Sequence, residues 1–139
     1  MDAIKEFREE RRRRIEALKE DSDFAVLSDH WTKDACDANY QYNFDWLGRP
    51  IIQFPNDILA VQELIWKVKP DLIIETGIAH GGSLILSASM LALMDLKDGR
   101  YDPEKRKVLG VDIDIRAHNK LAIESHPLFY LIEMIEGSS

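Results

Sequence analysis

An acidic residue and a glycine-rich turn follow a short apolar run near the middle of the chain. Residues 72–74, Leu-Ile-Ile, predict a strand buried on both faces of a parallel sheet, and Glu75 ends it. Residues 84–96 are nearly all apolar or small and predict a buried helix, which Ser83 begins. Glycine lets a ligand approach the backbone closely, and the first N–H groups of a helix have no partner within it. This pattern predicts a nucleotide site around the turn glycines, which are Gly77, Gly81 and Gly82.

The acid at Glu75 indicates which kind of nucleotide would bind. A carboxylate beside the turn would repel a pyrophosphate, whereas it would attract the ammonium group of the amino-acid part of S-adenosylmethionine. The glycines are spaced Gly-x-x-x-Gly-Gly, which differs from the Gly-x-Gly-x-x-Gly of dinucleotide sites. The alternative is a tight strand-to-helix turn that binds no ligand.

A second predicted strand, over residues 108–112, also ends in an acid. A carboxylate in this place can accept hydrogen bonds from both hydroxyls of a ribose. Asp114 would lie on the same side if the strand continued, but Asp112 directly ends the apolar run and is the first candidate. The separation from Gly77 to Asp112 exceeds the roughly 20 residues of the NAD pattern. The alternative role of Asp112 is to cap the helix that follows.

Composition limits the class of protein. The 139-residue chain is 45% hydrophobic, which is enough for one domain with a core. Its 25 acidic and 18 basic residues give a net charge of -7, which disfavours nucleic acid as a partner and favours a small molecule. The single cysteine, Cys36, suits a reducing compartment. With no run long enough to span a membrane and a charged amino terminus, we expect a cytoplasmic protein.

Two N-terminal segments precede the predicted strands. Residues 2–21 predict a charged helix, in which neighbouring glutamates cancel much of the charge of the consecutive arginines 11–14, so we expect a solvated or docking helix. Residues 22–53 are aromatic and polar without clear periodicity and predict an arm that covers a domain edge. An alternative is that Tyr40, Tyr42 or Trp46 lines a ligand site.

The remaining elements complete an alternating pattern. Helices are predicted from Pro55 to the residues before Pro70 and over residues 116–125, with a third strand over residues 130–136. We therefore divide the chain into an arm, residues 1–54, and a cofactor-binding half-domain, residues 55–139. His118 and His126 have no partner at metal-ligand spacing, so we interpret them as surface or capping histidines.

Five segments together resemble the cephalosporin hydroxylase family. That family has the Rossmann-like fold of class I S-adenosylmethionine-dependent methyltransferases and includes rhamnosyl and other sugar O-methyltransferases. The resemblance covers roughly residues 22–139 and implies an α/β fold of three layers, α/β/α, with a parallel sheet that ends after its third strand, behind a helical and aromatic arm. The matching segments are YNFDWLGRPIIQ at 42–53, PND at 55–57, ETGIAHGGS at 75–83, VDID at 111–114 and IEGS at 135–138.

The resemblance also implies a role for each matched position. Asp112 would bind the ribose hydroxyls, and His80 would face the cofactor's carboxylate or the reaction centre, unless it is an ordinary solvent-facing turn residue. The residues that would hold the methionine part are Glu75, Gly77, Gly81, Gly82 and Ser83, and those beside the adenine would be Ser138 and Ser139.

The implied activity is transfer of a methyl group from S-adenosylmethionine to a hydroxyl of a sugar, glycolipid or secondary metabolite. In the family, an acidic cluster beyond the third strand would bind magnesium and the methyl acceptor, and this chain has no counterpart, so we place no metal ligand or catalytic base. A three-stranded sheet would leave its first strand as an exposed apolar edge, so we expect the chain to be unstable unless a partner, such as a second copy, or further sequence completes the sheet. The alternatives are a non-catalytic module that binds cofactor or oligomerises, and a nicotinamide-dependent oxidoreductase or hydroxylase, which the glycine spacing disfavours.

Overall fold

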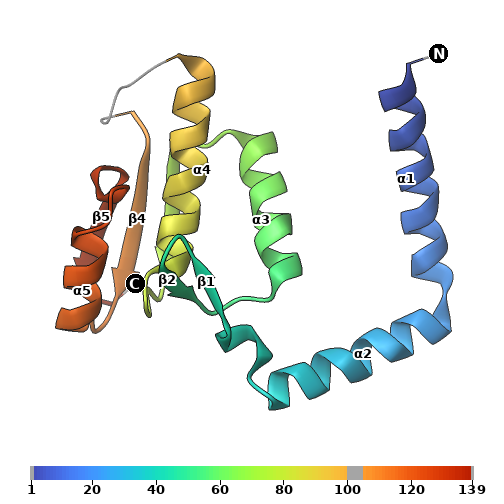
Figure 1. The fold of residues 1–139 in the computed structure, drawn as a ribbon, viewed down its shortest axis with the longest axis horizontal. Helices are drawn as coiled ribbons and strands as arrows, with labels where there is room; N and C mark the ends of the chain where they lie inside the picture. The colour runs from blue at the N-terminus through green and yellow to red at the C-terminus, as the bar shows by residue number, and fades with distance from the viewer. Residues whose placement is uncertain (1, 100–104, 139) are drawn as a thin grey trace. The chain divides into compact units, whose positions relative to one another are not determined.

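A computed structural model describes residues 2–99 and 105–138. The chain forms two compact units, residues 1–40 and residues 41–139. The first unit contains helices α1 (Ala3–Glu20) and α2 (Ser22–Asp37), and the second contains the strands and the other helices (Figure 1). The division at residues 54 and 55 that the sequence suggested stays a prediction. No helix within the described ranges is both long and apolar enough to cross a membrane.

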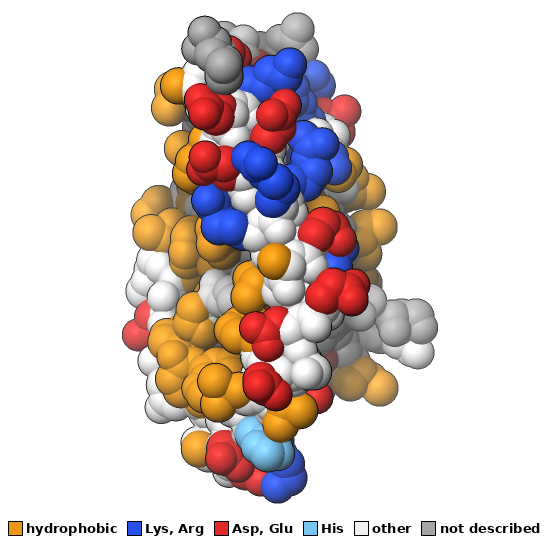
Figure 2. Space-filling view, turned by 90° about the vertical axis from the view of Figure 1, so that its right-hand side faces the viewer, with side chains coloured by type: hydrophobic (Ala, Val, Ile, Leu, Met, Phe, Trp, Pro, Cys, Tyr) orange, Lys and Arg blue, Asp and Glu red, His pale blue; other side chains and the backbone are white. Residues whose placement is uncertain are grey.

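Helix α1 is charged along its length, as predicted. Asp2 caps it by accepting a hydrogen bond from the Ile4 N–H at 3.1 Å, and none of its side chains is buried. The face seen in Figure 2 carries basic and acidic side chains close together. Salt bridges such as Arg14 to Glu10 at 3.3 Å account for part of this pattern.

Helix α2 corrects the interpretation of residues 22–53 as a stretch without periodicity. Asp21 caps this helix by accepting a hydrogen bond from the Phe24 N–H at 2.9 Å. Phe24, Leu27 and Trp31 recur at helical spacing, but the residues between them, which are apolar at 25–26 and polar at 28–30, obscure that pattern.

A hairpin follows at the start of the second unit. After a short 3₁₀ turn, η1 (Tyr40–Tyr42), strands β1 (Phe44–Trp46) and β2 (Arg49–Ile51) pair antiparallel. Leu47 and Gly48 join them with φ angles of 46° and 84°, the left-handed conformation that two-residue hairpin turns need. The hairpin packs on α4, and Ile51 is fully buried.

The rest of the unit is an α/β fold whose three-stranded parallel sheet is flanked by helices. The strand order is β3-β4-β5, and every crossover between neighbours contains a helix, as the alternating sequence pattern predicted. The elements in chain order are α3 (Pro55–Val68), β3 (Leu72–Thr76), α4 (Gly82–Asp98), β4 (Lys107–Asp112), α5 (Ala117–Glu124), the 3₁₀ turn η2 (Phe129–Leu131) and β5 (Ile132–Glu136).

The core lies on one face of this sheet. Side chains of α3, α4 and α5 meet those of β4 and β5 there, including Ile65, Leu84, Val108, Ile123 and Ile132.

The other face of the sheet carries exposed apolar side chains. Leu72 and Ile74 of β3 are 52% and 61% exposed, and Ile135 of β5 is 52% exposed. The prediction that residues 72–74 are buried on both faces is therefore wrong, because the helices among the described residues cover one face of the sheet and leave Leu72 and Ile74 on the other face without cover. The prediction of an exposed apolar edge at the first parallel strand is confirmed.

Candidate cofactor site

The turn between β3 and α4 has an unusual backbone. Gly77 and Gly81 both have a φ angle of 84°, and Ala79 has a φ angle of 47° although it carries a side chain. The Gly81 N–H donates to the Ile78 carbonyl at 2.8 Å, which closes the turn just before Gly82 begins α4. Left-handed conformations favour glycine, so Gly77 and Gly81 fit their positions and Ala79 is strained.

The glycines also permit close packing within the protein. A β-carbon on Gly81 would come within 2.5 Å of the Ile123 side chain, and one on Gly82 would clash with the backbone of Pro50 and Ile51. By contrast, a β-carbon on Gly77 would meet nothing within 4 Å. The sequence suggested ligand approach as the reason for all three glycines, whereas Gly81 and Gly82 have a packing reason of their own.

Glu75 lies one residue before the end of β3 and points to the start of α4. Ser83 donates a hydrogen bond from its hydroxyl to the Glu75 carboxylate. Burial raises the pKa of Glu75 above its ordinary value, and the bond from Ser83 opposes that rise. A partly buried carboxylate without a cation is poorly compensated, so this position favours a positively charged ligand group.

Asp112 ends β4, as predicted, and is held by backbone groups. Its Oδ2 accepts from the Ile78 N–H at 2.6 Å, and its Oδ1 accepts from the Asp114 N–H at 3.1 Å. These bonds, the one from Ile78 first, lower the pKa of Asp112. The strand does not continue to Asp114, so the two acids do not alternate along one strand.

Two pockets lie at this turn and share Ala79 and His80. One, of about 270 Å³, brings together Glu75, Gly77, His80, Gly82 and Ser83. Thr76, Ile78 and Ala79 also line it, as do three residues from earlier in the chain, Pro50, Ile52 and Gln53. The sequence missed these three because they belong to the segment interpreted as a covering arm.

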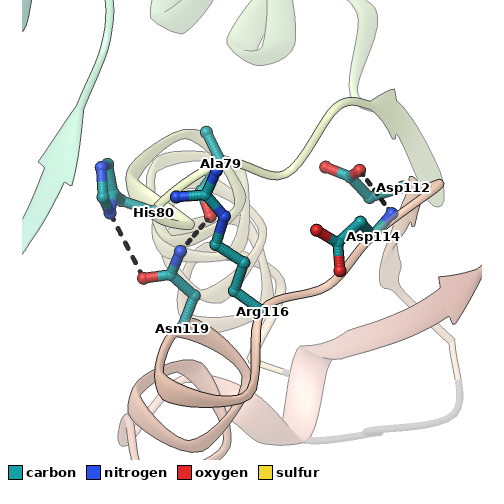
Figure 3. Close-up of a pocket in the computed structure, with 6 residues that line it drawn as sticks. All are labelled: Ala79, His80, Asp112, Asp114, Arg116 and Asn119. Carbon is teal, nitrogen blue, oxygen red and sulfur yellow. Dashed lines mark hydrogen bonds between the residues drawn. The ribbon is translucent and has the colours of Figure 1, made fainter.

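The second pocket, of about 390 Å³, contains Asp112 (Figure 3). Its other lining residues are Ala79, His80, Asp114, Arg116 and Asn119, and the sequence reading identified neither Arg116 nor Asn119 as a site residue. Asn119 is only 4% exposed and bonds the Ala79 carbonyl, which depends on the packing of α5 against the turn and is not indicated by the sequence alone.

The remaining predicted positions lie elsewhere or outside the described residues. Ser138 is exposed after β5 and lines neither pocket, although the Gly137 N–H donates to the Asp112 carbonyl at 2.8 Å and brings this segment near β4. Ser139 lies outside the described residues. Trp46 also lines neither pocket, since it packs on the core and its Nε1 donates to the Ser89 hydroxyl at 3.2 Å. Within residues 2–99 and 105–138, no group of three or more His, Cys, Asp or Glu side chains is arranged to hold a metal ion.

Comparison with known families identifies the class of protein. The family model for rhamnosyl O-methyltransferase/CmcI matches residues 38–139. The chain therefore belongs to the rhamnosyl O-methyltransferase/CmcI family, which confirms the resemblance to cephalosporin hydroxylase. No curated protein matches the chain in a direct search.

Two solved structures are similar to the chain. "CmcI-N160 apo-structure" has 22% sequence identity and a TM-score of 0.50, and the match covers 70% of this chain and 36% of that one. "cmcI-N160 SAH" has 21% identity and a TM-score of 0.49, with 68% of this chain and 43% of that one covered. The likeness to the apo structure supports the fold alone. The match spans less than half the length of either protein.

Proposed function

We propose that this chain binds S-adenosylmethionine and forms the cofactor-binding part of an O-methyltransferase. The methyl acceptor would be a hydroxyl of a sugar, glycolipid or secondary metabolite, in lipid or polysaccharide biosynthesis or antibiotic tailoring. Family membership supports the reaction class. The observation that carries the proposal is the placement of Glu75 and Asp112 in two adjoining pockets on either side of one glycine turn.

The smaller pocket suits the methionine part of the cofactor. Its ammonium group would neutralise the partly buried Glu75, whose raised pKa reflects the cost of holding a charge there. The Ser83 hydroxyl donates a hydrogen bond to the Glu75 carboxylate and would hold that carboxylate in place for the ammonium group. We propose that Gly77, Gly81 and Gly82 shape the backbone around this group, with His80 at the border of the two pockets.

The larger pocket suits the ribose. An ionised carboxylate has about four acceptor sites, and two of those on Asp112 are used by Ile78 and Asp114. The backbone N–H groups of Ala79 and Ile113 also approach this carboxylate, and we propose that its oxygens, which line the pocket, accept hydrogen bonds from the 2′ and 3′ hydroxyls as well. Because its pKa is lowered, Asp112 is ionised at neutral pH and acts as an acceptor only, which matches two hydroxyl donors. We keep Ser138 and Ser139 as proposed neighbours of the adenine.

The proposed chemistry is mainly positional. The sulfonium of bound S-adenosylmethionine supplies a methyl group that is already activated, so the protein's task is to align it with the acceptor oxygen and to assist removal of the acceptor's proton. Glu75, Asp112 and the turn would fix the cofactor, and we assign no residue of this chain to the acceptor or to magnesium. The charge balance and single cysteine support a small-molecule partner and a cytoplasmic location.

Calorimetric titration tests this proposal. We expect S-adenosylmethionine, and not NADH, to bind the purified chain, and Asp112→Ala to weaken that binding by roughly 1–3 kcal/mol, the cost of losing a hydrogen-bonded partner. Asp45→Ala, at an exposed position in β1, is the matched control and should leave the affinity unchanged. Binding of NADH instead would favour an oxidoreductase and contradict the proposal.

A second candidate function is a non-catalytic module that binds cofactor or oligomerises. The exposed side chains of Leu72 and Ile74 on the edge strand favour it, because an unpaired apolar edge promotes association. Cofactor binding and self-association without methyl transfer to any hydroxyl acceptor would distinguish this candidate from an active enzyme.

A further inference from the structure

One hydrogen-bonded network joins the hairpin, the glycine turn and α5. It consists of Arg49 from β2, Asn119 from α5, and the two turn residues Ala79 and His80. The network borders both proposed cofactor pockets, yet Arg49 lines neither of them. Arg49 therefore affects the site by holding the turn, whereas Asn119 bonds the turn and also lines the larger pocket.

Arg49 fixes the turn from the hairpin side. Its Nε and Nη2 both donate to the His80 carbonyl, at 2.9 and 2.6 Å, and Nη2 also reaches the Asn119 Oδ1 at 3.2 Å. Hydrogen bonds from a charged group are stronger than neutral ones, and a planar guanidinium directs them accurately.

Asn119 fixes the same turn from the opposite side. Its Nδ2 donates to the Ala79 carbonyl at 2.9 Å and its Oδ1 faces His80 (Figure 3). The same Oδ1 accepts from Arg49. The reversed amide would place an NH₂ group against a guanidinium and a carbonyl oxygen against a carbonyl oxygen. The network therefore permits only one amide orientation.

That orientation determines the state of His80. The Asn119 Oδ1 is an acceptor, and it lies 3.2 Å from the His80 Nδ1, so Nδ1 must carry the proton. In the neutral ring, Nε2 is then left with a lone pair. Within the described residues, Nε2 has no hydrogen-bond partner, and His80 lines both pockets.

The turn needs this support because its backbone is strained. Ala79 has a φ angle of 47°, a conformation that is unfavourable for a residue with a side chain. Asn119 donates a hydrogen bond to the Ala79 carbonyl, and Arg49 donates to the His80 carbonyl. Without these bonds, the turn could relax away from the pocket shape.

We propose that Arg49 and Asn119 are positioning residues that hold the turn in its cofactor-binding shape and keep His80 as the Nδ1–H tautomer, with Nε2 free to accept a hydrogen bond from the ligand. The donor would be an N–H or O–H group of the cofactor or of the acceptor substrate. This inference rests on the proposed function for its ligand, but the tautomer of His80 is a property of the free protein.

The tautomer is measured by nitrogen NMR of the histidine rings at a pH where they are neutral, with the His80 signals identified by their loss in His80→Gln. We expect the Nδ1–H form in the unaltered chain and a shift toward the Nε2–H form, which imidazole favours in water, in Asn119→Ala. A His80 ring with the proton on Nε2 in the unaltered chain would overturn the proposal.

Binding of S-adenosylhomocysteine, measured by calorimetry, tests the effect on the site. We expect Arg49→Met and Asn119→Ala to weaken it roughly tenfold to a hundredfold, the effect of losing a charged or buried hydrogen bond. Arg49→Lys, which keeps one donor, should restore part of the loss, and Lys120→Met, an exposed neighbour on α5, is the control. Unchanged affinity in Arg49→Met would contradict the positioning role. If the unaltered chain does not bind this ligand, the proposed function fails for the chain. The NMR measurement of the His80 tautomer still tests whether Asn119 and Arg49 orient His80 as proposed.

Discussion

The carboxylate of Asp112 accepts a hydrogen bond from the backbone N–H of Ile78 at 2.6 Å, which joins the end of β4 to the turn after β3. The turn and the proposed ribose ligand are thus parts of one structure. Losing the carboxylate would leave the Ile78 N–H without this partner, so a substitution at Asp112 should affect the fold as well as the binding of ligand.

This bond predicts a particular dependence of stability on pH. Because the pKa of Asp112 is lowered from its ordinary value of 3.8, its contribution to stability is present above that value and is lost as the pH falls through the folded-state pKa. We expect Asp112→Asn to lower the free energy of unfolding by roughly 1–3 kcal/mol at neutral pH. The difference between the two proteins should shrink below pH 3.8 in urea unfolding series. A difference that is the same at neutral and acid pH would contradict this account.

The pKa shift of Glu75 predicts a dependence of stability on pH that is opposite in sign to that of Asp112. Burial raises its pKa above 4.5, so the folded protein binds the proton more tightly than the unfolded chain, and stability falls as the pH rises through that window. Glu75→Gln should therefore stabilise the free protein at neutral pH, by on the order of 1 kcal/mol, in chemical unfolding experiments. The same substitution should weaken S-adenosylmethionine binding, because the amide cannot neutralise an ammonium group.

The control for Glu75 is Glu63→Gln, at an exposed position on α3. It should change neither the stability nor the affinity. A Glu75→Gln protein that is less stable than the unaltered chain, or that binds the cofactor equally well, would show that the carboxylate has no cost in the free protein or no role with the ligand.

Gly82 predicts a packing defect. A β-carbon at this position would clash with the Pro50 carbonyl and the Ile51 backbone, which cannot move as a flexible side chain would. We expect Gly82→Ala to lower the free energy of unfolding by about 1–3 kcal/mol, the usual cost of overpacking, and to displace the hairpin from α4. Gly137→Ala, where nothing lies within 4 Å of the added carbon, should change stability far less in the same thermal unfolding measurement. Equal effects would mean that the hairpin does not pack tightly on the turn.

Much of the α/β unit could be predicted from the sequence because its signals are local. Apolar runs that end at Glu75 and Asp112, separated by helical patterns, fix the order of strands and helices. The glycine turn marks where the two acids converge, since the carboxyl ends of parallel strands meet at one edge of a sheet. The structure places both acids there.

The parts that the sequence missed depend on contacts between distant segments. Arg49 and Asn119 are 70 positions apart, and neither has a neighbour in the sequence that indicates a shared role. The periodicity of helix α2 was obscured because both apolar and polar residues lie between Phe24, Leu27 and Trp31. The exposure of Leu72 and Ile74 depends on which face of the sheet the helices cover, and the apolar run alone cannot show this.

The uncovered face of the sheet makes self-association testable. Ile74 is 61% exposed on the edge strand, beside Leu72 and in register with Leu109 of β4. Burying such a face between two copies of the chain would remove apolar surface from water, so the apparent size on a sizing column should rise with protein concentration.

A lysine in place of Ile74 should repel its counterpart in a second copy and cover part of the apolar face, so Ile74→Lys should shift the column profile toward the monomer. Leu121→Lys, at a position that is 69% exposed on α5, adds the same charge elsewhere and should leave the profile as it was. If both variants shift the profile equally, general charge repulsion and not the β3 edge governs the association, and if the unaltered chain has one size at all concentrations, this face does not mediate association between copies.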